Sequence, residues 1–172
     1  MFQKILVALE NTRADDSLVP QIQKLASLLH SELLLVHVAD GWVARNFNQL
    51  KLAESEEMKS DRRYLESIAR RLRESGLKVS FHLALGEPAT EILKTADAEH
   101  CDLIAMTTHG HRLIGDIIYG STIENVRHKA TVPLFVVRAS PEVSSGEPRP
   151  FSTPPPGSKR SAPRSGCGCR RR

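Results

Sequence analysis

The run Ile5-Leu6-Val7-Ala8-Leu9 is apolar throughout and only five residues long. Such a run is typical of a strand that is buried on both faces, as strands are in the parallel sheets of α/β proteins. The polar residues 10–12 (Glu-Asn-Thr) then indicate a loop. One of residues 15–17 (Asp-Asp-Ser) is expected to cap a helix whose first turn includes Pro20, because a missing N–H has no helical partner there.

Further along the chain, strand and helix patterns alternate. Apolar residues at helical spacing extend over residues 47–72, and Gly76 is expected to end that helix. Shorter helices are expected after Gly86-Glu87-Pro88 and over residues 121–130. The further strands are predicted at 33–38, 77–83, 102–106 and 132–137. This order predicts an α/β fold, an open five-stranded parallel sheet with helices on both faces.

The charge and the prolines divide the chain into two parts. The chain has 172 residues, which favours one domain, and its net charge is +4. Residues 140–172 carry seven basic and two acidic side chains, which leaves residues 1–139 at −1. We therefore expect a domain over residues 1–139 and a disordered, basic, proline-rich tail over residues 140–172. Because the basic charge belongs to the tail, nucleic acid is not an expected partner of the domain.

Neither secretion nor membrane insertion is indicated. The first residues lack the apolar core and cleavage site of a secretory signal, and no apolar run approaches the ~20 residues that span a bilayer. The three cysteines are Cys101 and the tail pair Cys167 and Cys169, which do not make a disulfide framework. We expect a cytoplasmic protein without a membrane partner, and we interpret the tail cysteines as incidental.

A glycine-bearing loop follows the strand that ends near Thr107. Gly110 and Gly120 would let backbone N–H groups approach an anion, and Ser121 opens the next helix. Glu124, three residues later, completes a possible capping box with Ser121. The spacing allows two interpretations: a cradle for a phosphate, or a tight strand-to-helix turn that Ser121 caps.

Several motifs together resemble the universal stress protein family. Gly110, nine residues and then Gly120-Ser121 resemble the second half of that family's G-x2-G-x9-G-[S/T] motif. The matching flanks are Lys4-Ile5-Leu6-Val7-Ala8, Val36-His37-Val38, Gly86-Glu87-Pro88 and Val132-Pro133. The resemblance covers residues 2–139 and rests on a specific combination of motifs.

The resemblance implies a Rossmann-like domain with sheet order 3-2-1-4-5, commonly a homodimer, in which ATP lies across the carboxyl ends of the first and fourth strands. It implies phosphate contacts from the glycine loop and the start of the last helix, and adenine contacts from the backbone of Val38. Glu10 would hold the base or the ribose, and Ala8 would line the same wall. The implied nucleotide site comprises Ala8, Glu10, Val38, Thr107, Gly110, Gly120, Ser121 and Thr122.

Two positions depart from the family's nucleotide-binding pattern. Thr107 stands where the motif has its first glycine, so a β-branched side chain is expected where the backbone approaches phosphate. Glu10 stands where the family usually has Asp, and its longer side chain would shift a ribose contact. We predict a stress-response protein that binds ATP or a related adenine nucleotide and acts through dimerisation and an unidentified protein partner. The alternative is a dimeric interaction protein with a degenerate phosphate loop.

No set of residues predicts catalysis, and we predict that the protein is not an enzyme. The sequence has neither G-x-G-x-x-G after the first strand nor G-x-x-x-x-G-K-[S/T]. His109 and His111 have no third ligand at suitable spacing, so no metal site is predicted. His37 is interpreted as an interior histidine with satisfied hydrogen bonds, and nothing marks Cys101 as an activated nucleophile.

The last predicted strand is the expected dimer interface. Its apolar residues Leu134–Val137 are expected at an edge of the sheet, where unpaired backbone groups otherwise invite aggregation. A second copy of the chain is therefore the expected partner of this edge.

Overall fold

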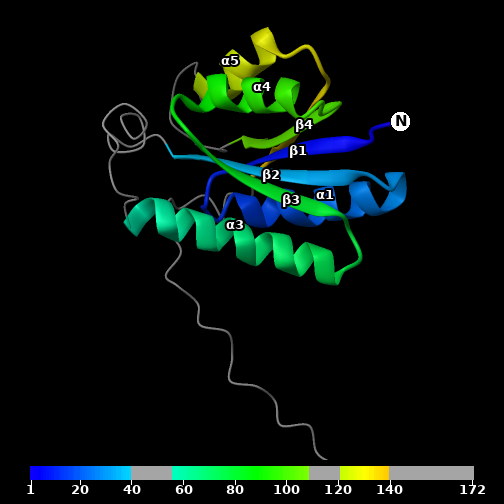
Figure 1. Ribbon diagram of the computed structural model, residues 1–172. Helices are drawn as coiled ribbons and strands as arrows, with labels where there is room; N and C mark the ends of the chain where they lie inside the picture. The colour runs from blue at the N-terminus through cyan, green and yellow to red at the C-terminus, as the bar shows by residue number, and fades with distance from the viewer. Residues whose placement is uncertain (40–55, 109–120, 140–172) are drawn as a thin grey trace, which may run out of the picture.

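The computed structural model describes residues 1–39, 56–108 and 121–139. Within these residues, strands and helices alternate as the sequence predicts (Figure 1). The elements are β1 (Lys4–Leu9), α1 (Asp15–Leu29), β2 (Glu32–Ala39), α3 (Glu56–Glu74), β3 (Val79–Leu85), α4 (Pro88–Ala98), β4 (Leu103–Thr108), α5 (Ser121–Lys129) and β5 (Leu134–Arg138). The expected strands begin or end one or two residues away from these bounds, and the expected tail lies outside the described residues.

The five strands form one parallel sheet in the order β3-β2-β1-β4-β5. This order confirms the expected 3-2-1-4-5 arrangement. β1 lies at the centre between β2 and β4, which agrees with the burial of nearly its whole length. β3 and β5 form the two edges.

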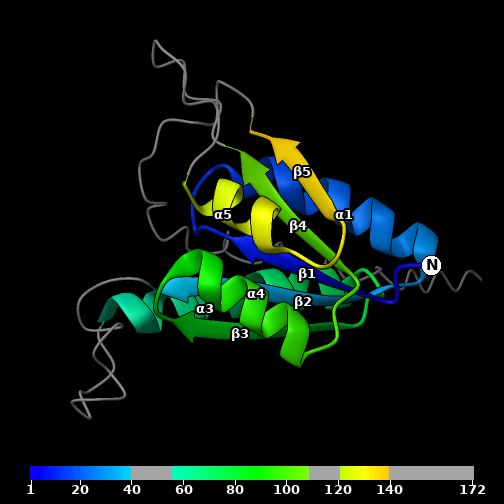
Figure 2. The same ribbon diagram turned by 90° about the horizontal axis from the view of Figure 1, so that it is seen from above.

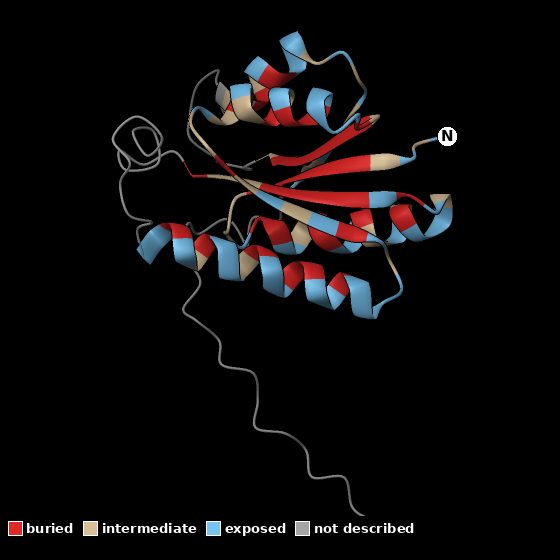
Figure 3. Ribbon diagram, viewed as in Figure 1, coloured by how far each residue is buried: buried red, intermediate tan, exposed pale blue. Residues whose placement is uncertain are grey.

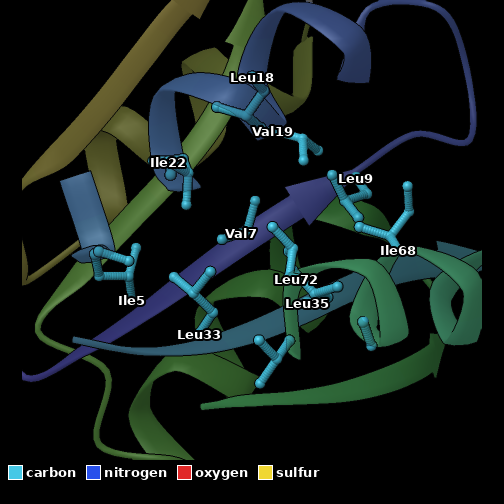
Figure 4. Close-up of a cluster of buried hydrophobic side chains, with 14 of the residues drawn as sticks. Ile5, Val7, Leu9, Leu18, Val19, Ile22, Leu33, Leu35, Ile68 and Leu72 are labelled. Carbon is cyan, nitrogen blue, oxygen red and sulfur yellow. The ribbon is translucent and has the colours of Figure 1, made fainter. Parts of the chain in front are cut away.

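Helices cover both faces of the sheet (Figures 1 and 2). α1 and α3 lie on one face, where their apolar side chains pack against Ile5, Val7 and Leu9 of β1 (Figure 4). α4 and α5 lie on the other face and pack against Leu6 and Ala8. Figure 3 shows that the buried side of each helix faces the sheet. Successive residues of β1 thus alternate between two apolar layers, which explains its unbroken apolar sequence.

Two predictions about α1 are wrong: that one of residues 15–17 caps the helix, and that Pro20 lies in its first turn. The residue before the helix is Ala14, which makes no side-chain capping bond, and the helix begins at Asp15. Pro20 is the sixth helical residue and lies beyond the first turn. Its exposed position lets the ring project into solvent, although a proline there leaves one helical hydrogen bond unmade.

The other helix boundaries follow local chemistry. α3 ends at Glu74, and Gly76 adopts a φ of 91°, which confirms the expected glycine stop. Glu87 caps α4 by accepting hydrogen bonds from the backbone N–H groups of Ala89 and Thr90, and Pro88 is the first helical residue. No described helix is both long and apolar enough to cross a bilayer.

Candidate functional site

The strand register brings several predicted site residues to one edge of the sheet. Leu9 of β1 pairs with His37 of β2, so Glu10 and Val38 follow at the same level. Val7 pairs with Ala105 of β4, which places the end of β4 beside the end of β1. Ligands of open α/β sheets bind at this carboxyl edge. Gly110 and Gly120, the two glycines of the predicted phosphate loop, lie outside the described residues.

Some of the predicted site residues lie on the α4 and α5 side of this edge. Ala8 is buried and belongs to the apolar cluster on the α4 and α5 side, and Val38 packs against the same cluster. Thr122, in the first turn of α5, is partly exposed. Ser121 is the first residue of α5. Oε1 of Glu124 lies 2.7 Å from both Arg127 and His128, one turn further on. The expected capping box with Ser121 stays a prediction, because the Ser121 side chain lies outside the described part of the chain.

Thr107 points away from that face. Leu103 and Ala105 of β4 pack on the α1 and α3 side, so the period-two alternation of a strand directs Thr107 to the same side. The side chain is only 1% exposed. Strand alternation therefore directs the Thr107 side chain to the α1 and α3 side of the sheet. Its expected effect on a phosphate stays a prediction, because Gly110 and Gly120 lie outside the described residues.

The neighbouring Thr108 was not among the predicted site residues, but it lies at the same end of the sheet. It follows Ile104 and Met106 in alternation, which directs its side chain to the α4 and α5 side, and it is partly exposed. Its carbonyl oxygen accepts a hydrogen bond from the backbone N–H of Ala139. The alternation of β4 in the sequence is enough to predict the direction of this side chain.

The Thr107 hydroxyl has an energetic consequence. Its buried Oγ1 has no hydrogen-bond partner within the part of the chain that the structure describes. A hydroxyl without a partner costs free energy when it is buried, so we expect Thr107→Val to raise the free energy of unfolding by about 1 kcal/mol. Urea denaturation followed by circular dichroism measures the change. Thr107→Ser, which keeps the hydroxyl but loses the methyl group, should be less stable than the parent. A loss of stability in Thr107→Val would instead mean that the hydroxyl has a partner, such as a bound water.

A buried carboxylate organises the loop between β1 and α1. Asp15 is 1% exposed, and its carboxylate accepts hydrogen bonds from the backbone N–H groups of Glu10, at 3.2 Å, and Thr12, at 3.4 Å. The hydroxyl of Tyr64, on α3, donates to the same carboxylate at 2.8 Å. Burial raises the pKa of Asp15, and these hydrogen bonds partly offset that effect. The loop thus directs two backbone N–H groups to the protein's own carboxylate.

A second polar cluster lies beside the first and joins β2 to α3. The ring of His37 places Nδ1 2.8 Å from the carbonyl oxygen of Leu9 and Nε2 3.4 Å from Oδ2 of Asp61. The side-chain amide of Asn11 donates to Oδ1 of Asp61 at 2.9 Å. His37 is therefore an interior histidine with partners at both ring nitrogens, which confirms its interpretation from the sequence.

The ionisation of this second cluster is set by its internal contacts. Burial alone would lower the pKa of His37, but Asp61, the Leu9 carbonyl and the charge of Asp15 together raise it above its ordinary value. Burial alone would raise the pKa of Asp61, but hydrogen bonds from His37 and Asn11 hold it below its ordinary value. Both directions favour an ion pair between an imidazolium and a carboxylate.

The remaining candidate residues are a cysteine and the side chains that could hold a metal ion. Cys101 is buried, and burial raises its pKa to about 11, so its thiol is mostly protonated near neutral pH. Among the described residues, no three His, Cys, Asp or Glu side chains are grouped so as to hold a metal ion. His109 and His111 lie outside those residues.

Comparisons with known proteins agree on one family. The model of the universal stress protein family matches residues 1–138. The universal stress protein MJ0577 of Methanocaldococcus jannaschii is 29% identical over 158 residues, which cover 80% of this chain and 96% of that protein. The solved structure of MJ0577 superposes with a TM-score of 0.68, at 28% identity over 81% of this chain and 98% of that chain.

Two further solved structures contain nucleotides. A universal stress protein from Archaeoglobus fulgidus in complex with dAMP has a TM-score of 0.60 at 21% identity, and covers 79% of this chain and 98% of its own. A universal stress protein in complex with cAMP has a TM-score of 0.59 at 16% identity, and covers 81% of this chain and 98% of its own. At these identities the likeness establishes the fold.

Proposed function

The chain belongs to the universal stress protein family, and from this premise we propose that it binds an adenine nucleotide at the carboxyl edge of its sheet. The observation that carries the proposal is the register, which aligns Glu10 with Val38 and gathers Ala8 and Val38 on the α4 and α5 side. In this assignment the backbone of Val38 contacts the adenine, and the carboxylate of Glu10 accepts a hydrogen bond from the ribose. Ala8 supplies an apolar wall beside them.

The adenosine portion is the best supported part of the ligand. The two nucleotides found in the related structures, dAMP and cAMP, share an adenine on a ribose-type sugar and differ in the sugar hydroxyls and the phosphate. We assign the phosphates to the start of α5, where Ser121 and Thr122 lie, together with Gly110 and Gly120. The positive end of a helix dipole favours an anion at such a position. ATP is the proposed physiological ligand.

The first experiment is to measure nucleotide content and affinity. The protein is purified and denatured, the supernatant is analysed by chromatography, and ATP and AMP are titrated into nucleotide-free protein by calorimetry. Co-purified adenine nucleotide or micromolar affinity supports the proposal. The absence of both nucleotide and binding heat up to millimolar ATP would contradict it.

Glu10→Ala is expected to weaken nucleotide binding by roughly ten- to a hundredfold. The physical reason is the loss of a hydrogen bond between a charged acceptor and the ribose, which contributes about 1.5 to 3 kcal/mol. Calorimetry measures the change in the dissociation constant. Glu32→Ala is the matched control, because Glu32 begins β2 at the opposite edge of the sheet, where it pairs with Lys78. Equal weakening in both variants would contradict the assignment of Glu10.

A second candidate function is favoured by the edge strand β5. Its residues Leu134–Val137 are all apolar, none of them is fully buried, and Val136 is 41% exposed. We propose that a second copy of the chain covers this edge and that the dimer surface docks a protein partner in a cytoplasmic stress response. In this view the protein acts by binding and performs no catalytic step.

Val136→Arg is expected to convert a dimer into a monomer. The long charged side chain would have to lose its hydration at the covered edge, whereas it costs little at a free edge. Light scattering at a fixed protein concentration measures the mass. Leu28→Arg provides the control, since Leu28 is 78% exposed on α1 and should keep the dimer intact. A monomeric parent protein would contradict the proposed interface.

A further inference from the structure

The cluster of His37, Asp61 and Asn11 joins three parts of the chain. His37 and Asn11 directly adjoin two residues of the candidate nucleotide site, Val38 and Glu10. His37 lies on β2, Asp61 lies in the second turn of α3, and Asn11 lies in the loop that follows β1. The His37 and Asp61 side chains are 13% and 10% exposed. Contacts this well shielded are screened little by solvent ions, so the charges within the cluster act strongly on one another.

The two contacts of the His37 ring favour one protonation state. The Leu9 carbonyl, 2.8 Å from Nδ1, can only accept a hydrogen bond, so Nδ1 must carry a proton. The ionised Asp61 carboxylate, 3.4 Å from Nε2, is also only an acceptor. A neutral imidazole has one N–H and cannot donate to both groups. Both contacts are satisfied together only when His37 is an imidazolium.

Loss of the second proton would change the contact with Asp61. The Leu9 carbonyl retains the proton on Nδ1, so Nε2 would present a lone pair to a carboxylate oxygen 3.4 Å away. An attraction between opposite charges becomes a repulsion between a lone pair and a negative charge. Asp61 would then lose its ion pair with the ring and keep the hydrogen bond from the Asn11 side chain.

Asn11 transmits that change to the loop. Its φ of 57° lies in the left-handed region, which is unfavourable for most residues and which asparagine tolerates better than others. The bond from its side-chain amide to Asp61 holds this conformation from one side. Asp15 holds the loop from the other side through the backbone N–H of Glu10. The position of Glu10 therefore depends on both carboxylates, and only one of them contacts a group that titrates near neutral pH.

We propose that His37 is a protonation-dependent positioning residue for the loop that carries Glu10: its imidazolium fixes Asp61, Asp61 fixes Asn11, and the loop loosens when the ring loses its second proton. Resting on the proposed function, this assigns a regulation to the nucleotide site, namely that adenosine binds more weakly as pH rises.

The direction of the pH dependence follows from the groups that face the ring. Asp61 from α3 and the Leu9 carbonyl from β1 contact it, Asp15 from α1 adds a negative charge, and β3 places the apolar Leu83 opposite His37. These polar groups raise the pKa of His37 in the folded protein, against the effect of burial. The ordered loop is therefore fully present below the ordinary imidazole pKa of about 6.5 and is lost as pH rises through the raised pKa of His37.

The test begins with ligand-free protein, so that it does not depend on nucleotide binding. The ring resonances of His37 and the side-chain amide resonances of Asn11 are followed by NMR from about pH 5.5 to about pH 8.5. We expect both sets to titrate with one midpoint above about 6.5. In Asp61→Asn the His37 midpoint should fall and the Asn11 resonances should cease to follow it. Glu66→Gln, an exposed position on the same helix, is the control and should titrate like the parent.

The affinity for adenosine is then measured by calorimetry across the same range, because adenosine carries no phosphate that titrates there. The dissociation constant of the parent is expected to rise by about three- to tenfold, and that of Asp61→Asn to change little. A His37 midpoint at or below about 6.5, or Asn11 resonances independent of it, would overturn the proposal. Coupled titration without adenosine binding at any pH would support the loop switch and overturn the proposed nucleotide function.

Discussion

Replacing Leu65 with alanine is expected to lower the free energy of unfolding by about 2 to 5 kcal/mol, the range found when a buried leucine leaves a cavity. Leu65 lies on α3, is fully buried, and belongs to the cluster that α1 and α3 form with the sheet. The loss combines the transfer of the missing methyl groups with the empty volume that the rigid sheet cannot fill.

Urea denaturation followed by circular dichroism measures this loss, with the slope of the transition checked for two-state behaviour. Leu28→Ala is the matched control: it makes the same chemical change on another helix, at a position that is 78% exposed. That variant should stay within about 0.5 kcal/mol of the parent. A similar loss in both variants would mean that α3 does not pack on the sheet as described.

Replacing Asp15 with alanine is expected to lower the free energy of unfolding by about 2 to 4 kcal/mol. The substitution removes the acceptor of the Glu10 and Thr12 backbone N–H groups and of the Tyr64 hydroxyl, and leaves these donors partly buried without a partner. Burial of the carboxylate is itself unfavourable and raises the pKa of Asp15. The net loss of stability is therefore smaller than the sum of the hydrogen bonds that are broken.

The same denaturation experiment measures the effect of Asp15→Ala. Asp97→Ala is the control because Asp97 is an exposed aspartate on α4, and it should change the stability by no more than about 0.5 kcal/mol. Tyr64→Phe removes only the donated hydroxyl and should cost about 1 kcal/mol. A stable Asp15→Ala variant would show that the loop hydrogen bonds contribute nothing net to folding.

The sequence alone determined the order of the elements and the class of the fold. The signals are local: apolar runs of strand length, helical periodicity between them, a helix end near Gly76 and a helix start at Pro88. Each of these signals depends on a few neighbouring residues only. The central position of β1 followed from the resemblance to a family, which the comparisons confirmed over residues 1–138. The gathering of Ala8, Glu10 and Val38 at one edge followed from the parallel order of the strands.

Only the tertiary structure decided how individual polar side chains are used. Asp15 is a residue type that commonly caps helices, but backbone N–H groups of the loop before it and the hydroxyl of Tyr64 on α3 bind its carboxylate, so it organises the loop instead. Thr107 stands at the position of the motif's first glycine, and strand alternation directs its side chain to the α1 and α3 layer, since a shift of one residue reverses the side.

His37 and Asp61 show the same limit most clearly. They are 24 positions apart in the chain, and neither residue type at either position predicts the other. Their pairing arises because α3 packs across the end of β2, and the proton on His37 follows from an acceptor on each side of its ring. Short-range patterns determine which elements form, whereas contacts between elements far apart in sequence determine which side chains meet and which of them carry charge.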